Sequence, residues 1–250
     1  MKKYELTTET IQFAGRTLHR IKALRDIGSV KAGKFGGWIE NEKNLSQADN
    51  AWIYSEAMVS DNAKVFGNAR VFGNAKILGN AHIFGNAHIF GNAKIFGNAK
   101  IFDYARVYYN ARVYGDAIVH NNAIVYDNAI VYDNAIVSGY AEVCENAKVC
   151  DNAEVYGLTR IFGNAKIFGY ATIKGDAKVY DAADYIVFKN FWSSERYFTW
   201  TRSNNKWSVG CFYGTGEELI KKAYADSDTS GREYERVVKY VESILADERK

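Results

Sequence analysis

Residues 67–102 read GNARVF GNAKIL GNAHIF GNAHIF GNAKIF GNAKIF, six copies of one six-residue unit with no insertion. Outward from this stretch, Ile or Val occupies all 22 positions that lie six apart from Ile53 to Val179. Ala stands two residues before each of them, except at Thr159. A helix rotates positions six apart by about 240° and cannot keep them on one side. Short strands separated by Gly-Asn or Asp-Asn corners can, so the repeat predicts a rod of stacked β-coils.

The Ile or Val and the Ala of each unit are expected to point inward and to form the core. Burying each aliphatic side chain contributes ~1.5–3 kcal/mol, so this core needs neither a disulfide nor a metal. The Asn before each Ala suits a corner, because Asn tolerates a positive φ. Stacked Asn side chains are also expected to form ladders of hydrogen bonds. The chain has no proline, which agrees with a sheet that uses nearly every backbone N–H.

The unit resembles that of the hexapeptide-repeat, left-handed parallel β-helix superfamily. In that unit an aliphatic residue is followed four positions later by a small one, as Ile89 is by Ala93. The resemblance implies three hexapeptides per triangular coil and about seven coils stacked ~4.8 Å apart. It also implies the left hand, against the general preference for right-handed crossovers. Trimers are typical of this superfamily, and its acyltransferases place a catalytic His at a subunit interface.

The flanks of the repeat predict two further units. Residues 1–50 are expected to form an N-terminal β cap, with strands at 4–7 and 17–24 around a turn at Ala14 and Gly15. Residues 51–183 form the β-helix, and residues 184–250 a C-terminal α+β domain. Capping boxes at residues 215–218 and 230–233 predict the starts of two helices in that domain. The N-terminal flank, with the stretches 30–33 and 36–40, resembles the opening of hexapeptide proteins from enteric bacteria and prophages that are described as polymer-forming or transferase-like. The C-terminal flank resembles the tails of prophage-encoded hexapeptide proteins.

Composition narrows the class of protein. The net charge is +3, with 48% hydrophobic and 24% charged residues, an ordinary globular composition. The first residues, MKKYE, precede no apolar run, which predicts no signal peptide, and no stretch approaches the ~18 apolar residues of a membrane helix. Three cysteines do not make a disulfide framework. We therefore expect a cytoplasmic protein with neither membrane nor nucleic acid as partner, and the resemblance implies that the cell is a bacterial host.

The residue that follows each inward Ile or Val is aromatic at 15 of the 22 positions. With three hexads per coil, aromatics 18 residues apart should stack, as in the series Tyr54, Phe72, Phe90, Tyr108 and Tyr126. One interpretation is that these ladders only stabilise the rod. The favoured interpretation is burial by another chain or by the C-terminal domain, because a monomer rarely exposes so large an apolar surface.

The residue that precedes each inward Ile or Val is mostly basic in the first half of the repeat. Residues 61–114 carry seven basic and two acidic side chains, and residues 115–157 carry one basic and seven acidic. Two interpretations stay open: a solvated surface, or a basic collar that binds an anion or an acidic partner. The candidate binding residues are Lys76, Lys94, Arg112, Arg70, Arg106, Phe90, Phe96, Tyr108 and Tyr114. The first three are 18 residues apart and are expected to form one column.

Apolar side chains replace these charges in the middle of the repeat. The candidate interface residues are Ile118, Ile124, Ile130 and Ile136, with Tyr126 and Tyr132. This band predicts a homo-oligomer, and the resemblance favours a trimer.

Catalysis is not the favoured interpretation. The hexads run without an insertion, so the repeat offers no loop to build a pocket, and His82, His88 and His120 occupy outward slots. No metal-ligand spacing, P-loop or nucleophile elbow occurs, and we predict no catalytic residue, metal or cofactor. The predicted function is a non-catalytic rod that binds or scaffolds, as a phage or prophage accessory protein that binds, and inhibits, a host protein. The alternatives are an acyltransferase with an intersubunit site and a binder of nucleotides or other small anions.

Overall fold

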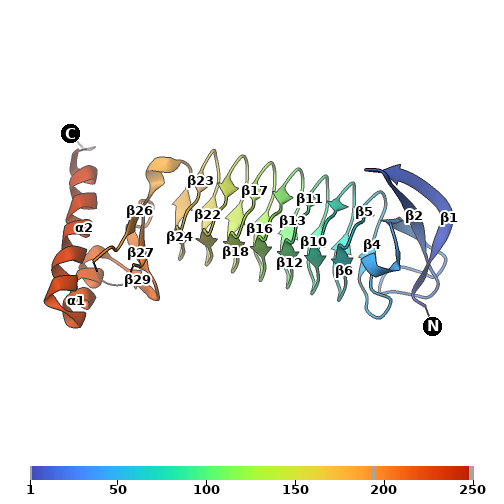
Figure 1. Ribbon diagram of the computed structural model, residues 1–250, viewed down its shortest axis with the longest axis horizontal. Helices are drawn as coiled ribbons and strands as arrows, with labels where there is room; N and C mark the ends of the chain where they lie inside the picture. The colour runs from blue at the N-terminus through green and yellow to red at the C-terminus, as the bar shows by residue number, and fades with distance from the viewer. Residues whose placement is uncertain (1, 193–194, 248–250) are drawn as a thin grey trace.

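The computed structural model describes residues 2–192 and 195–247 and has the shape of a long rod (Figure 1). A hairpin of β1 (Tyr4–Phe13) and β2 (Arg16–Ala23) lies at one end, and the helices α1 (Gly216–Asp226) and α2 (Asp228–Asp247) lie at the other. A β-solenoid of about eight turns, each turn crossing three parallel sheets, connects the two ends. The predicted coil architecture is confirmed, with one more turn than expected.

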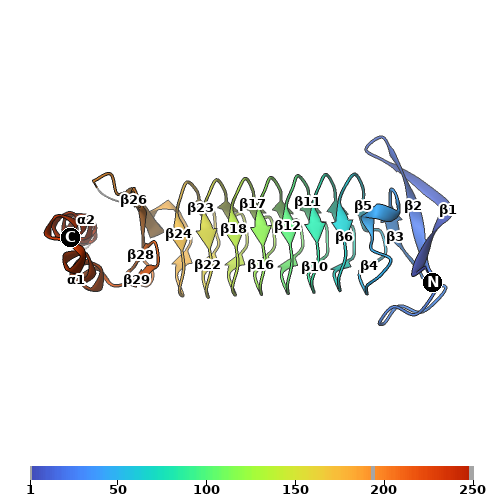
Figure 2. The ribbon, with the colours of Figure 1, turned by 60° about the horizontal axis from the view of Figure 1, so that its bottom comes forward.

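Three faces run along the solenoid, and Figure 2 shows their strands aligned one behind another. Face 1 consists of β3 (Phe35–Ile39), β5 (Met58–Val59), β8 (Lys76–Ile77), β11 (Lys94–Ile95), β14 (Arg112–Val113), β17 (Ile130–Val131), β20 (Lys148–Val149) and β23 (Lys166–Ile167). Face 2 consists of β4 (Trp52–Ile53), β7 (Arg70–Val71), β10 (His88–Ile89), β13 (Arg106–Val107), β16 (Ile124–Val125), β19 (Glu142–Val143), β22 (Arg160–Ile161) and β25 (Lys178–Val179). Face 3 consists of β6 (Lys64–Val65), β9 (His82–Ile83), β12 (Lys100–Ile101), β15 (Ile118–Val119), β18 (Ile136–Val137), β21 (Glu154–Val155) and β24 (Thr172–Ile173).

The interior of the solenoid follows the repeat. The second residue of each two-residue strand, such as Ile89 on β10, is fully buried, and so is the Ala two residues before it. Thr159, which replaces one Ala, is also buried, and its hydroxyl has no hydrogen-bond partner among the described residues. The predicted core is therefore confirmed position by position.

The extra turn comes from the segment that we predicted to be a separate cap. β3 pairs in parallel with β5, joining Trp38 to Met58. Leu45 makes a parallel bridge to Val65. The residues between β3 and Leu45 include a short 3₁₀ helix, η1 (Glu42–Asn44). The parallel ladder thus begins at β3, before the regular hexad starts, because a strand needs only backbone groups and inward apolar residues to join it.

The corners between faces combine positive φ angles with side-chain ladders. At Gly85 (φ +66) an added Cβ would lie 2.7 Å from the backbone nitrogen of Asp103 in the next coil. Where a carboxylate residue takes this position, it bonds to the next coil: Glu145 (φ 56) accepts a hydrogen bond from the Gly163 N–H at 3.0 Å. The predicted Asn ladders are confirmed, for example by the Asn74 amide donating to Asn92 at 3.3 Å.

Parallel pairing exchanges backbone hydrogen bonds in both directions, but the bonds made at the strand ends and corners run one way along the rod. At these positions each coil donates N–H groups to carbonyl oxygens of the next coil, as Arg70 does to Ala87 at 2.9 Å. The first coil is therefore left with unused carbonyl groups. Lys3 is fully buried, and its Nζ donates a hydrogen bond to one of these carbonyl oxygens, that of Ala51, at 2.9 Å. Burial lowers the pKa of this ammonium group to about 8, although Asp49 opposes the shift.

The last coil has the opposite need, because its N–H groups find no further coil. The C-terminal domain supplies acceptors: the Thr199 hydroxyl accepts from the Thr172 N–H at 2.9 Å, and the Ser203 hydroxyl accepts from the Lys178 N–H at 2.7 Å. The carboxylate of Asp184, in η2 (Ala182–Asp184), accepts from the Tyr180 N–H at 2.7 Å. The C-terminal domain therefore closes the solenoid as well as following it.

That domain is an antiparallel sheet covered by the two helices. Its strands are β26 (Tyr185–Lys189), β27 (Tyr197–Thr201), β28 (Lys206–Val209) and β29 (Phe212–Gly214), in that order. Phe198, Trp207, Leu219, Val238 and Val241 form its core. The predicted capping box of α1 is confirmed at Thr215 and Glu218. The second predicted box is wrong: α2 begins at Asp228, because the Ser227 hydroxyl already accepts from the Ser230 N–H.

The closing contacts of the last coil can be tested at Thr199. Thr199→Val keeps the shape of the side chain but leaves the Thr172 N–H without its acceptor, which should lower the free energy of unfolding by ~1–3 kcal/mol. Thr199→Ser keeps the hydroxyl and should lose clearly less. Denaturant unfolding followed by tryptophan fluorescence measures both. Equal stability of the Val and Ser variants would contradict a role for this hydroxyl in closing the solenoid.

Candidate functional site

The structure distributes the predicted binding residues over two faces. Face 1 carries Lys76, Lys94 and Arg112 with Phe96 and Tyr114, and face 2 carries Arg70 and Arg106 with Phe90 and Tyr108. The predicted column is confirmed, because Lys94 pairs in register with Lys76 on one side and with Arg112 on the other. The set therefore forms two parallel surfaces and not one site.

The first member of the face 1 column is already engaged by the N-terminal hairpin. The Lys76 ammonium group lies 4.8 Å from the centre of the Phe13 ring, a cation–π contact. Lys94 and Arg112 are exposed and form no ion pair within the described part of the chain. These two cations are consequently the members of the column that face solvent.

The predicted aromatic columns are confirmed on all three faces. On face 2, Phe90 and Tyr108 stack with ring centres 4.5 Å apart, and on face 1, Phe96 and Tyr114 stack at 4.6 Å. Stacking leaves most of these rings half-buried, although Phe168 remains 51% exposed. Much of the apolar surface is thus covered within the chain itself.

The outward isoleucines encircle the rod. Ile118 and Ile136 lie on face 3, Ile124 on face 2 and Ile130 on face 1. Ile130 is only 9% exposed and the others are half-buried. Tyr126 and Tyr132 follow the isoleucines of faces 2 and 1. Because the band includes residues of all three faces, the structure does not show which face would form the predicted interface.

Two cysteines of the repeat are shielded from solvent. Cys144 and Cys150 occupy outward slots of the repeat, but both are buried. Each thiol lies beside a tyrosine of the preceding coil, Cys144 beside Tyr126 and Cys150 beside Tyr132. The pKa of Tyr126 is raised by partial burial and by the neighbouring thiol, and the pKa of Tyr132 by the neighbouring thiol and by partial burial. A short side chain in this slot lies beneath the larger ring of its neighbour, which covers it. Burial raises the pKa of the Cys150 thiol.

A groove lies between the N-terminal cap and face 2 of the solenoid. The cap loop at Ile27 and Gly28 makes one side of it, and Arg70, His88 and Tyr104 are among the solenoid residues that line it. Its volume is about 410 Å³. The uninterrupted hexads predicted no such concavity, because the loop that builds it comes from the cap and not from the repeat.

His88 is the titratable group of this groove with a shifted pKa. It lies between Arg70 and Arg106 in the parallel register of face 2. The rings of His88 and Phe72 are T-shaped to one another, with their centres 5.9 Å apart. Partial burial lowers the pKa of His88, and the two arginines lower it further. A neutral imidazole at neutral pH can accept a proton, which is the requirement for a general base.

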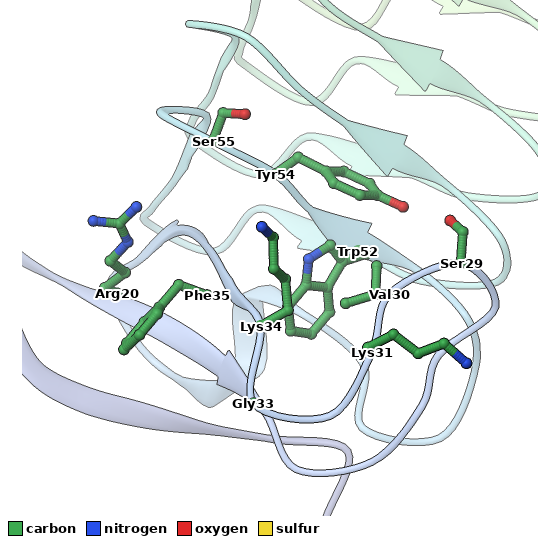
Figure 3. A pocket seen from close by; sticks show the side chains of 10 residues that line it. All are labelled: Arg20, Ser29, Val30, Lys31, Gly33, Lys34, Phe35, Trp52, Tyr54 and Ser55. Atoms are coloured by element: carbon green, nitrogen blue, oxygen red, sulfur yellow. The ribbon is translucent and has the colours of Figure 1, made fainter.

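A larger cleft of about 700 Å³ lies on the other side of the same loop, and Tyr54 lines both spaces. Figure 3 shows its side chains: Arg20, Lys31 and Lys34 bring three cations, and Phe35, Trp52 and Tyr54 bring aromatic rings. Sequence reasoning missed the cleft. The sequence feature that could have revealed it is the Lys- and Gly-rich stretch at 31–37. This stretch does not follow the repeat, and it precedes the first hexads, in which Trp52 lies.

Other kinds of site find less support. No group of three or more His, Cys, Asp and Glu side chains that could hold a metal ion occurs within residues 2–192 and 195–247. Over the same residues, the helices are too short or too polar to cross a membrane.

Comparison with known proteins identifies the repeat and one relative. The YdcK beta solenoid repeat family matches residues 105–121 and 123–139. The chain is also 35% identical over 68 residues to the uncharacterized acetyltransferase YdcK of Escherichia coli strain K12. This match covers 24% of the chain and 21% of the relative, so the chain spans about a fifth of the length of the curated protein that it resembles. The chain thus contains YdcK-like β-solenoid repeats.

The electrostatics of the groove predict a titration experiment. Arg70→Gln removes a positive charge beside His88, so the protonated imidazole is repelled less and the pKa of His88 should rise. The pKa of His82, which lies on face 3 away from Arg70, should stay unchanged. Imidazole proton shifts followed by NMR between pH 4 and 8 measure both, and an unaltered His88 midpoint would contradict this account.

Proposed function

We propose that the protein is an acyltransferase of the left-handed hexapeptide-repeat type, with its reaction centre in the groove at His88. The observation that carries this proposal is the position of His88: a half-buried imidazole with a lowered pKa, in a groove and next to an arginine. His82 occupies the equivalent slot on face 3, but the groove beside the cap loop is lined by His88 and not by His82.

The chemistry follows from these two side chains. Neutral His88 takes the proton of an amine or hydroxyl acceptor. At the same time, the lone pair of the acceptor's nitrogen or oxygen attacks the carbonyl carbon of an acyl thioester. The Arg70 guanidinium stabilises the negative charge that develops on the carbonyl oxygen. The carbon–sulfur bond then breaks, and the His88 imidazolium returns its proton to the departing thiolate. The acyl group ends on the acceptor, and the free thiol leaves.

Two further observations support this proposal. The relative from Escherichia coli carries the name acetyltransferase, which favours an acetyl group as the one transferred. The groove is open toward solvent on one side, and a second subunit packed on face 2 would close it. That arrangement agrees with the intersubunit sites and trimers that the superfamily resemblance implies.

Paired histidine variants test the proposal. His88→Gln should lower the rate of thiol release from acetyl-coenzyme A in the presence of amine acceptors by about 10²–10⁴-fold, the usual contribution of a general base. His82→Gln removes a histidine from the matching slot of another face and should leave the rate unchanged. A thiol-reactive dye measures the release.

The result that counts against acyl transfer is equally specific. If both variants release thiol at the rate of the unchanged protein, or if that protein releases none with any of a panel of amines and hydroxyl compounds, the groove is not an acyltransferase centre. Circular dichroism and melting curves must first show that the variants retain the solenoid.

A second candidate is the non-catalytic scaffold, in which the rod associates through its charged surfaces. The observation that favours it is the in-register column of face 1, where Lys94 and Arg112 are exposed without acidic partners among the described residues. Adjacent like charges ~4.8 Å apart repel one another, and an acidic surface would offset that repulsion. Residues 115–157 of a second copy, with one basic and seven acidic side chains, provide such a surface. A role as a prophage accessory protein that binds a host protein belongs to this candidate.

Light scattering tests the scaffold. At micromolar concentration and low salt we expect a mass of several chains, decreasing as salt screens the charges. Replacing Lys94 and Arg112 with Gln should weaken assembly and make it less sensitive to salt. A constant mass near 28.1 kDa across concentrations would contradict self-association, and identical assembly of the double variant would show that the column is only a solvated surface.

A further inference from the structure

The cleft beside the cap loop has features that acyl transfer at His88 does not use. Trp52, the first strand residue of face 2, is only 1% exposed, and its indole nitrogen has no hydrogen-bond partner among the described residues. A buried N–H group without an acceptor costs free energy, so such groups are rare unless a ligand or a water completes them. In Figure 3, this nitrogen lies on the edge of the ring that is turned toward the Lys34 ammonium group and Tyr54.

The cations of the cleft are not equally available. The Arg20 guanidinium donates to the Glu9 carboxylate at 3.0 Å and lies 5.6 Å from the centre of the Phe35 ring. Lys31 donates to the Asp26 carboxylate at 2.7 Å. Lys34 forms no ion pair with any residue in the described ranges, and it is exposed. The positive charge that faces the open space without an internal partner therefore belongs to Lys34.

The aromatic lining complements this charge. Phe35 is 48% exposed at the mouth of the cleft, and Tyr54 is half-buried against the solenoid, with its ring tilted by 40° to that of Phe72 and the ring centres 5.1 Å apart. Ring faces of this kind bind planar groups by stacking. A cavity of about 700 Å³ has room for a ligand with both a planar ring and an anionic group.

We propose that this cleft binds a phosphorylated ring compound of about the size of a mononucleotide. Its phosphate pairs with Lys34, a hydrogen-bond acceptor of its ring takes the Trp52 N–H, and its ring lies against the exposed aromatic side chains. Solvent does not reach the indole nitrogen in the ligand-free arrangement, so the Lys34 side chain moves toward the phosphate as the ring enters. This site is separate from His88 and does not depend on acyl transfer there.

Calorimetric titration of the full chain with ADP, and separately with inorganic pyrophosphate, tests the proposal. ADP should bind, and Lys34→Gln should weaken its binding by about tenfold, the usual effect of losing one charge-assisted contact. Lys43→Gln makes the same change of charge on the cap surface outside the cleft, and it should leave ADP binding unchanged. Trp52→Phe removes the N–H and part of the ring, so it should weaken ADP binding, and the space that it leaves in the core should lower the melting temperature of the free protein.

The remaining outcomes overturn the proposal or part of it. No binding of ADP at millimolar concentration overturns it, and so do equal losses in the Lys34 and Lys43 variants, because those indicate unspecific attraction. Equal affinity for pyrophosphate and ADP shows that the ring is not recognised and overturns the role of Trp52. If Trp52→Phe unfolds, the comparison of Lys34→Gln with Lys43→Gln still decides whether the anion binds in this cleft. Loss of thiol release in His88→Gln with ADP binding intact would confirm that the two sites are distinct.

Discussion

The structure depends on the parallel ladder of backbone hydrogen bonds between coils, in which the N–H groups at strand ends and corners donate to carbonyl oxygens of the next coil. Repetition satisfies every interior coil but leaves carbonyl groups at the first coil and N–H groups at the last. The two flanks answer these needs with opposite chemistry. The buried ammonium group of Lys3 donates at one end, and the hydroxyl groups of Thr199 and Ser203 accept at the other. The groups left at the two ends thus differ, and each flank supplies side chains that hydrogen-bond to the groups at its own end.

The same ladder turns every 18-residue recurrence into a physical column. Favourable and unfavourable contacts both recur along such columns. Phe90 stacks on Tyr108, whereas Lys94 lies in register with two other cations. The corners show how the chain manages a local cost. Glu145 takes a positive φ that Gly would adopt with less strain, but its carboxylate accepts the Gly163 N–H of the following coil. The repeat can therefore vary at its corners as long as the substitute still bonds to the next coil.

Sequence reasoning succeeded where periodicity determines position. The inward residues, the Asn ladders and the register of Lys76, Lys94 and Arg112 all follow from counting by six and by 18. It failed where one element meets another without a period. The contact of Phe13 with Lys76 and the covering of Cys144 by its neighbours depend on side-chain shapes in three dimensions. The groove at His88 was missed for the same reason, since a search for insertions within the repeat does not reveal a loop that arrives from the cap.

The repeat itself offers a small ligand open faces and shallow hollows along its corners, which make few simultaneous contacts. More enclosed spaces arise where a non-repeating segment packs on the rod, because the loop at residues 24–34 packs on face 2 and creates both the groove and the cleft. His82 and His88 illustrate the consequence, because they hold the same slot of the same unit with basic neighbours above and below, and both have a lowered pKa. The groove beside the cap loop is lined by His88 and not by His82. The difference between a surface histidine and a candidate base therefore lies in the segment that interrupts the repeat, and function in such a rod should be sought first where its periodicity ends.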